Sequence, residues 1–399
     1  MRSSLPAVLG GLPAFPDGLP LVRPWVPDIP GIGRRIEAVL ASGRLTVGPL
    51  VRELEDTVAE YLGVEHVVAV ASCTSGLMLV LQALGATGPV VLPSFTFSAS
   101  AHAVVWAGGS PVFADIEPES LTLDPEAAAA AAAGAVAVMA THVFGTPCAV
   151  ERLQAVADEA GLPLVYDAAH ALGSRRRGRP IGGFGAAEVF SLSPTKVVVA
   201  GEGGLVATND AALAEACRLG RDYGNPGDYD CRFPGLNARM SELHAAVALA
   251  SFAQLDERVA HRNALVETFK AATARLPGLS FPSVDDADVS TYKDLTLLVD
   301  GPAFGLTAEE LGQALRAEGI DCRRYYVPPV HRQRAYAGLA AADPLPVTER
   351  VADQVLTPPL WSHMKGETVR QVAEAVVRLQ QRSVDVQKLL AQDAEVLGG

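Results

Sequence analysis

Residues 190–204 read FSLSPTKVVVAGEGG and place Lys196 between a short apolar strand and a glycine-rich turn. The 399-residue chain has five lysines, and Lys196 is the only one among the first 269 residues. Arginine, which is plentiful, cannot lose its proton, whereas a partly desolvated lysine can act as an amine nucleophile. This stretch alone leaves two interpretations open, a reactive amine and a solvated lysine at the end of a strand.

Apolar runs and amphipathic runs alternate through residues 50–210, which predicts an α/β fold with a mostly parallel sheet flanked by helices. Ligands of such sheets bind beyond the carboxyl ends of the strands. Four candidate positions lie at or just after such ends: Thr74/Ser75, Phe97, Asp167 and Lys196. The expected strands are 66–70, 90–93, 111–115, 136–139 and 163–166, and the expected helices are 32–41, 50–62, 77–84, 127–133, 149–160 and 211–222.

The composition suggests three parts. Residues 1–25 are rich in Pro and Gly and are predicted to form an arm over the body or a neighbouring subunit. Residues 26–265 form the predicted large domain, and residues 266–399 a smaller α+β domain. In the second half we expect helices over 241–276, 307–318 and 366–392 and strands over 291–298 and 320–326. The long loop 221–240 is typical of a functional or interface segment.

Bulk properties exclude several classes of protein. The net charge of −13 argues against general nucleic-acid binding, which needs a basic surface. Five scattered cysteines without a CxxC pair predict reduced thiols, with no disulfide framework and no metal site. No apolar run reaches transmembrane length and no signal pattern is present, so we expect a cytoplasmic protein without a membrane partner.

The candidate positions combine into one chemistry. The chain has no GxGxxG after a strand, no GxxxxGK[ST], no HExxH and no GxSxG. A lysine, an aspartate, an aromatic ring and a helix N-terminus suited to phosphate are what pyridoxal 5'-phosphate (PLP) requires. Taken singly, each has a plainer interpretation: Thr74, Ser75 or Asp167 as helix caps, His170 as a core histidine and Phe97 as ordinary packing.

From about Thr46 to His331 the chain resembles the sugar aminotransferases of the DegT/DnrJ/EryC1/StrS family, which are PLP-dependent enzymes of fold type I. Several separated motifs agree in order and spacing. The resemblance implies a Schiff-base lysine at Lys196, a pyridine-nitrogen partner at Asp167 and a phosphate ligand at Ser191. It also implies phosphate contacts from Thr74 and Ser75, a stacking ring at Phe97, and a residue near the ring's face or 3-hydroxyl at His170.

Further implied positions concern the partner subunit and the substrate. Asn237 in Gly-Leu-Asn-Ala-Arg-Met matches an asparagine that reaches the phosphate from the neighbouring subunit, which implies a homodimer with shared active sites. Gly48, Tyr326 and His331 are substrate candidates. For a nucleotide diphosphate, the arginines at 175–179, Arg221 and Arg232 are candidates, although a solvated loop explains the cluster equally well.

The resemblance implies transfer of an amino group from Glu or Gln, through pyridoxamine 5'-phosphate, to a keto-sugar. The expected acceptor is a nucleotide (dTDP-type) keto-deoxysugar, in amino-sugar or natural-product biosynthesis. One alternative acceptor is a keto-cyclitol or another cyclic ketone. A PLP-dependent dehydratase is a second alternative, although there the lysine is typically replaced by histidine. A non-catalytic regulator is a third. The sugar, the aminated carbon and its stereochemistry are left open.

Overall fold

The computed structural model describes residues 5–338 and 344–398; parts of the predicted arm and small domain, 1–4, 339–343 and 399, lie outside these. Its centre is a seven-stranded sheet of order β1-β9-β8-β5-β4-β2-β3. The strands are β1 (His66–Val70), β2 (Pro89–Pro93), β3 (Ser110–Ala114), β4 (Ala137–Thr141), β5 (Leu164–Asp167), β8 (Ala187–Ser191) and β9 (Gly204–Thr208). Only β9 runs antiparallel to its neighbours, which confirms the mostly parallel sheet.

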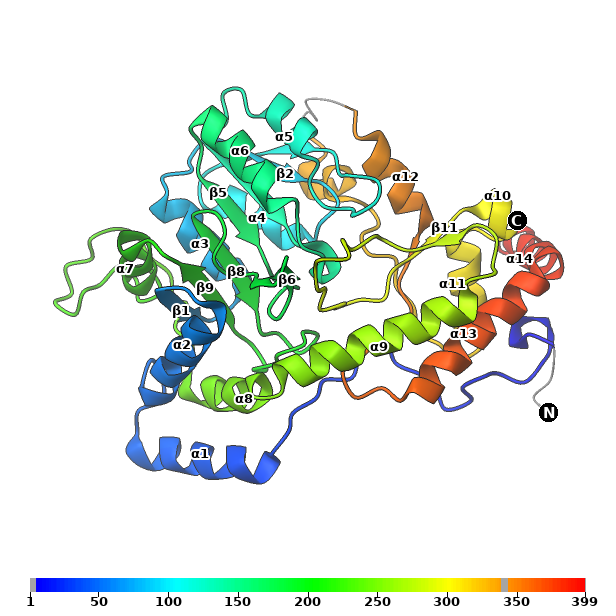
Figure 1. Ribbon diagram of the computed structural model, residues 1–399, viewed down its shortest axis with the longest axis horizontal. Helices are drawn as coiled ribbons and strands as arrows, with labels where there is room; N and C mark the ends of the chain where they lie inside the picture. The colour runs from blue at the N-terminus through cyan, green and yellow to red at the C-terminus, as the bar shows by residue number, and fades with distance from the viewer. Residues whose placement is uncertain (1–4, 339–343, 399) are drawn as a thin grey trace.

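Helices cover both faces of this sheet (Figure 1). Its inner strands are buried on both sides, which explains their continuous apolar runs. One face packs against α3 (Cys73–Ala83), α4 (Ser98–Trp106) and α7 (Ala211–Gly220). The other packs against α2 (Pro49–Leu62), α5 (Pro125–Ala131), α6 (Val150–Ala160) and α8 (Glu242–Phe252). Helix α1 (Ile29–Ser42) lies outside α8.

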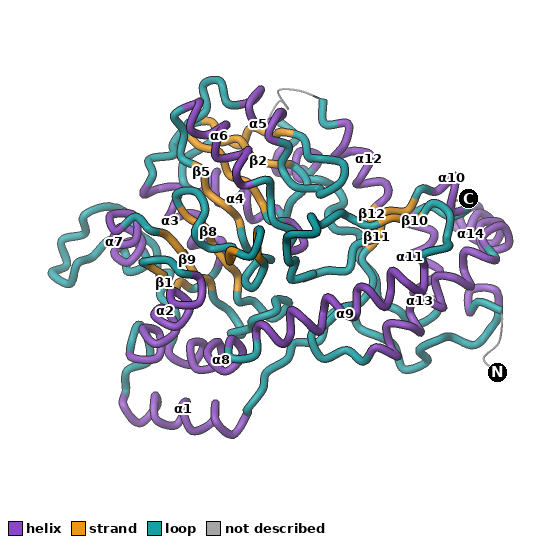
Figure 2. The backbone as a smooth tube through the Cα atoms, viewed as in Figure 1, coloured by secondary structure: helices purple, strands orange, loops and turns teal. Residues whose placement is uncertain are grey.

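A second core forms around a small antiparallel sheet that lies apart from the large one (Figure 2). That sheet has the order β10-β11-β12, with β10 (Leu279–Ser280), β11 (Leu297–Val299) and β12 (Val355–Leu356). Around it lie α9 (Leu255–Thr273), α10 (Gly301–Phe304), α11 (Ala308–Ala317), α12 (Pro346–Gln354), α13 (Gly366–Gln381) and α14 (Ser383–Gly398). The predicted domain boundary at 265/266 falls inside α9 and stays a prediction.

The N-terminal segment packs on this second core of its own chain. Ala14 and Leu19 are buried in the core, and the carboxylate of Glu318 accepts the backbone N–H groups of Ala7 and Ala14 at 2.9 and 2.8 Å. Arg378 balances that buried charge, with 2.9 Å between its guanidinium and Glu318. No helix among the described residues is both long and apolar enough to cross a membrane.

Four expected elements were wrong in extent. The helix over 241–276 is broken between α8 and α9, and the helix over 366–392 between α13 and α14, where Arg382 leaves helical φ/ψ. Of the strand expected over 291–298, only Leu297 and Leu298 lie in a strand, β11. The carbonyls of Thr291, Tyr292 and Lys293 accept hydrogen bonds from Arg262 instead of from a neighbouring strand. Residues 320–326 make single bridges to Leu19 and Thr357 in place of a strand.

Gly76 allows α3 to approach the sheet closely and so sets the position of the helix N-terminus. A Cβ at Gly76 would lie 2.7 Å from Val189 and 3.1 Å from Val206. We expect Gly76→Ala to lower the free energy of unfolding by about 1–3 kcal/mol through overpacking. Gly33→Ala, in a helix with open space around it, is the control and should raise that free energy by about 0.5–1 kcal/mol. Urea denaturation measures both, and equal effects would contradict the close-approach argument.

Candidate active site

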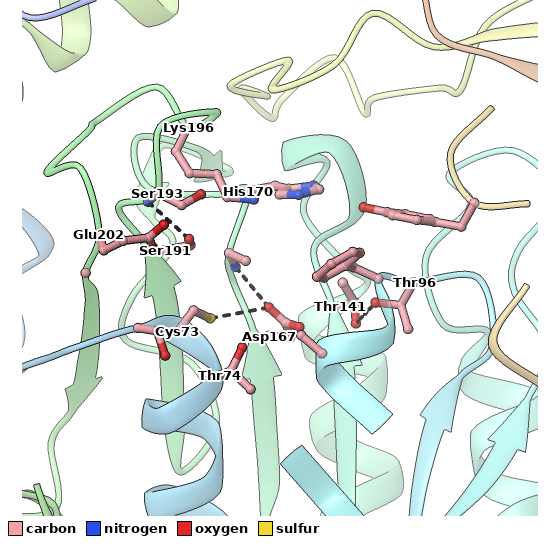
Figure 3. Close-up of a pocket in the computed structure, with 16 residues that line it drawn as sticks. Cys73, Thr74, Thr96, Thr141, Asp167, His170, Ser191, Ser193, Lys196 and Glu202 are labelled. Atoms are coloured by element: carbon pink, nitrogen blue, oxygen red, sulfur yellow. Dashed lines mark hydrogen bonds between the residues drawn. The ribbon is translucent and has the colours of Figure 1, made fainter. Parts of the chain in front are cut away.

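A cavity opens at the carboxyl ends of β4, β5 and β8 (Figure 3). Its empty volume, counted together with the solvent space at its mouth, is about 690 Å³. Its place agrees with the expectation that ligands of parallel sheets bind at this edge. Seven of the predicted site residues line it: Thr74, Phe97, Asp167, His170, Ser191, Lys196 and Tyr326. Four do not: Gly48, Ser75, Asn237 and His331.

Lys196 stands on the loop between β8 and β9, with its side chain at the cavity (Figure 3). Its backbone N–H donates to the Ser193 carbonyl at 3.0 Å, which closes a tight turn after the strand. Burial, followed by the positive charge of Lys293, lowers the pKa of Lys196 to about 8. The neutral fraction of this amine near physiological pH is therefore far larger than that of an ordinary lysine, and the neutral form is the nucleophile.

Asp167 ends β5 and forms part of the cavity wall, with only 4% of its surface exposed. Its Oδ1 accepts the Ala169 N–H at 3.1 Å and lies 3.8 Å from the Cys73 sulfur. Its Oδ2 accepts the Ser100 hydroxyl at 2.6 Å. These contacts hold a carboxylate at the cavity in one orientation.

The N-terminus of α3 supplies the anion-binding side of the cavity. Ser72 caps the helix by accepting the Ser75 N–H at 3.1 Å, and the N–H groups of Cys73 and Thr74 belong to the first turn, which has no intrahelical acceptors. The helix dipole adds positive potential there. Ser191 reaches the same cavity from β8.

Ser75 contributes to the cap and not to the cavity wall. Its hydroxyl donates to the Ser72 carbonyl at 2.8 Å and accepts the Ser72 N–H at 3.1 Å, which completes a capping box. Ser75 therefore acts as a helix cap in this geometry and its predicted phosphate contact stays a prediction, while Thr74 lines the cavity.

Two aromatic rings line the cavity. Phe97 is 59% exposed in the single chain, so one face of its ring is free to stack on a planar ligand. The ring of Tyr326 lies 6.3 Å from that of Phe97 and stacks on Phe144 at 6.0 Å, which fixes it in the wall. The first of these rings is suited to a ligand contact and the second to shaping the site.

His170 is a neutral hydrogen-bonding group in this environment. The backbone N–H of Phe144 donates to its Nδ1 at 3.1 Å, so its own ring proton resides on Nε2. Burial, together with the positive charges of Lys196 and Lys293, lowers the pKa of His170 well below its ordinary value. His170 is therefore suited to donate a hydrogen bond and not to carry charge.

The remaining predicted residues have partners outside the cavity. The Gly48 N–H donates to Glu242 at 2.8 Å at the start of α2, and His331 lies between Ser94 at 2.6 Å and Glu349 at 2.7 Å. Asn237 is exposed, and its backbone forms a bridge with Asp222. None of these three contacts the cavity of its own chain.

Three of the six arginine candidates form ion pairs. Arg176 binds Glu151 at 3.1 Å and Asp288 at 2.7 Å, and buried Arg221 binds Glu55 at 2.5 Å. Arg232 pairs with two aspartates of its own loop. None of the three lines the cavity.

Several cavity residues were not predicted as ligands: Ser72, Cys73, Thr96, Ala99, Thr141, Ala169, Ser193, Glu202 and Gly203. Most are sequence neighbours of predicted positions, and that adjacency was the available signal. The buried pair of Lys293 and Asp294, 2.9 Å apart, also bears on Lys196 through its charge. No pattern in the sequence around Lys293 pointed to the site.

The lowered pKa of Lys196 predicts a pH dependence. The neutral amine attacks aldehydes, so the rate at which the apoprotein captures added PLP should rise as the pH passes through about 8. Stopped-flow absorbance between pH 6 and pH 11 measures this rate. A rise centred near the ordinary lysine value of 10.5 would contradict the desolvated environment.

Comparison with known proteins agrees with this geometry. Residues 31–377 match the model of the DegT/DnrJ/EryC1/StrS aminotransferase family. The chain is 36% identical over 347 residues to the dTDP-3-amino-3,4,6-trideoxy-alpha-D-glucose transaminase of Streptomyces venezuelae, covering 86% of this chain and 90% of that protein. It is 29% identical over 365 residues to the dTDP-4-amino-4,6-dideoxy-D-glucose transaminase of Escherichia coli, covering 90% and 98%.

A solved structure extends the similarity to three dimensions. The crystal structure of DesI in the presence of its TDP-sugar product superposes with a TM-score of 0.90 at 38% identity, covering 97% of this chain and 98% of that one. The predicted fold type I is thereby confirmed. The chain is an aminotransferase and belongs to the DegT/DnrJ/EryC1/StrS aminotransferase family.

Proposed function

We propose that this aminotransferase uses PLP to move an amino group from Glu or Gln to a nucleotide-linked keto-deoxysugar. The observation that carries the proposal is the convergence of Lys196, Asp167 and the N-terminus of α3 on one cavity. Two relatives that are 29% and 36% identical over most of the chain are transaminases of dTDP-linked amino sugars, and the structure of DesI was determined in the presence of its TDP-sugar product. These similarities support this acceptor class.

The residues present fit the cofactor by the chemistry of their donors and acceptors. Thr74, Ser191 and the first turn of α3 would hold the phosphate, and Asp167 would accept the N–H of the pyridine nitrogen. Phe97 would stack on the ring. When bound, PLP supplies an aldehyde that takes up the amino group and a ring that withdraws electrons from the reacting carbon.

The protein's own groups then divide the remaining work. Lys196 Nζ, with its lowered pKa, takes a proton from the carbon of the amino donor that bears nitrogen. In the second half of the reaction it delivers a proton to the carbon of the acceptor that receives nitrogen. His170 would donate a hydrogen bond from Nε2 to a group bound in the cavity while its ring stays uncharged. Tyr326, stacked on Phe144, shapes the cavity wall beside Phe97.

The identity of the amino acceptor is tested by offering the protein ketones of two chemical classes. The purified protein is incubated with glutamate or glutamine labelled with 15N at the α-amino group, together with a dTDP-linked keto-deoxysugar or a keto-cyclitol. Mass spectrometry that finds 15N in the nucleotide sugar supports the proposal. Label in the cyclitol alone supports the alternative acceptor, and loss of oxygen without gain of nitrogen supports a dehydratase.

We further propose a homodimer in which Asn237 reaches the phosphate of the partner's site. Asn237 is exposed and does not line the cavity of its own chain, and the loop that precedes it projects from α7 (Figure 1). This proposal predicts complementation between two inactive variants, Lys196→Ala and Asn237→Ala. A mixed dimer pairs the intact lysine of one chain with the intact asparagine of the other, so it has one complete site.

Co-refolded mixtures should recover roughly a quarter of wild-type activity if chains pair at random. Each variant refolded alone is the control and should stay inactive or weakly active. Mixtures no more active than the average of the two variants would contradict a shared site, because a cis-acting Asn237 leaves every mixed dimer without a complete site.

A further inference from the structure

The carboxylate of Asp167 has three polar neighbours from three different segments. The Ala169 N–H and the Cys73 sulfur lie 3.1 and 3.8 Å from Oδ1, and the Ser100 hydroxyl lies 2.6 Å from Oδ2. An ionised carboxylate only accepts hydrogen bonds, so Ala169 and Ser100 donate, whereas the thiol of Cys73 has a nearer acceptor in the Val189 carbonyl at 3.3 Å. Burial beside Asp167 raises the pKa of the Cys73 thiol well above its ordinary value, so it retains its proton.

Ser100 is the last member of a chain of buried hydroxyls. Its oxygen lies 3.0 Å from Thr96 Oγ1. Thr96 Oγ1 in turn lies 3.2 Å from Thr141 Oγ1, and Figure 3 shows these two threonines. Because the single proton of Ser100 points to Asp167, Thr96 donates to Ser100 and Thr141 donates to Thr96. The exposed fractions are 0% for Ser100, 1% for Thr96 and 7% for Thr141, so little water competes for these bonds.

This geometry leaves an acceptor position open on Oδ2 of Asp167. Each carboxylate oxygen accepts about two hydrogen bonds. Oδ1 accepts the Ala169 N–H and has the Cys73 sulfur 3.8 Å away, whereas Oδ2 receives only Ser100. The oxygen that the hydroxyl chain fixes can therefore accept a second hydrogen bond.

We propose that the Thr141–Thr96–Ser100 chain positions Asp167 so that Oδ2 accepts the N–H of a protonated pyridine nitrogen. Ser100 and Thr96 are thus positioning residues that act through Asp167. This inference rests on the proposed placement of the cofactor. Aligned hydroxyls polarise one another, so the bond from Ser100 to Asp167 is stronger than that of an isolated serine.

The hydroxyl of Ser100 connects two elements that are far apart in the sequence. Ser100 is the third residue of α4, and its hydroxyl donates to Asp167 at the end of β5, 67 residues away along the chain. This contact fixes the carboxylate of Asp167 relative to α4.

The test follows the pyridine nitrogen directly. [15N-pyridine]PLP is bound to wild type, Ser100→Ala, Thr96→Val and Asp167→Asn, and the 15N chemical shift reports whether the nitrogen is protonated. The dissociation constant for PLP is measured in parallel. Thr273→Val is the matched control, because Thr273 is a buried hydroxyl that donates to a carbonyl of α9 away from the cavity.

We expect Ser100→Ala to shift the nitrogen toward the unprotonated value and to raise the dissociation constant about tenfold, as loss of a hydrogen bond to a charged group implies. Thr96→Val should shift the nitrogen in the same direction and raise the dissociation constant about threefold. If Ser100→Ala does not fold, Thr96→Val alone tests the proposal. Thr273→Val should leave both quantities unchanged.

The outcomes separate the two proposals. A nitrogen that is protonated in the wild type, unprotonated in Asp167→Asn and still protonated in Ser100→Ala and Thr96→Val overturns the positioning role while leaving the proposed function intact. A wild type that binds no PLP, or whose nitrogen does not respond to Asp167→Asn, overturns both.

Discussion

Replacing Lys196 with alanine is expected to lower the rate of amino transfer by on the order of 10⁴-fold or more, a loss typical of removing a catalytic nucleophile. Lys196 is the only lysine that lines the cavity in the described part of the chain. No neighbouring group can replace both its amine and its proton transfer. The visible absorbance band that PLP gives when it is bound to Lys196 should also disappear.

Lys388→Ala is the matched control for this prediction. Lys388 is exposed, lies on α14 and does not line the cavity, so its loss should leave the rate and the band unchanged. Initial rates with glutamate and a nucleotide keto-sugar, together with absorbance spectra, measure both variants. A Lys196→Ala protein with a rate within tenfold of wild type would contradict the assigned role.

Asp167→Asn is expected to lower the turnover number by roughly 10²- to 10³-fold, as removal of one preorganised electrostatic partner does. The amide cannot provide the negative charge that stabilises a protonated pyridine nitrogen in a site screened from water. Its shape is nearly that of the carboxylate, so the fold should be retained. The KM for the keto-sugar should change far less than the turnover number, because Asp167 is assigned to the cofactor.

The control for Asp167 is another aspartate at the same edge of the sheet. Asp115 directly follows β3 and accepts the N–H groups of Val347 and Thr348 at the start of α12, away from the cavity. Asp115→Asn should cost about 1 kcal/mol of stability, as the weakening of a helix cap does, and leave turnover intact. Equal losses of turnover in both variants would point to a general effect on the sheet.

The sequence was a good guide to the large sheet because its inner strands are buried on both faces. Such strands appear as short apolar runs between amphipathic helices, and His66–Val70 and Pro49–Leu62 lie within one residue of their expected bounds. The segments predicted wrongly lack that signal. Residues 320–326 read IDCRRYY, in which Ile320, Cys322 and two tyrosines favour a strand, but single bridges to Leu19 and Thr357 are their only ladder contacts among the described residues.

The site residues also fall into those that a sequence pattern could predict and those that it could not. Lys196, Asp167 and Thr74 were predictable because parallel strands deliver the residues after their carboxyl ends to one edge. Ser75 and His331 were not separable from true cavity residues, because their competing partners, Ser72 and Glu349, depend on side-chain geometry. The Ser100 contact with Asp167 joins segments 67 residues apart, which no local pattern shows.

The central claim is that Lys196 is the residue that takes up the cofactor, and its most direct test is the site of covalent attachment. The protein is mixed with PLP, reduced with borohydride and digested, and the modified peptide is identified by mass spectrometry. We predict a pyridoxyl group on Lys196 and on no other of the five lysines. Attachment to the buried Lys293, or to no lysine, would contradict the account.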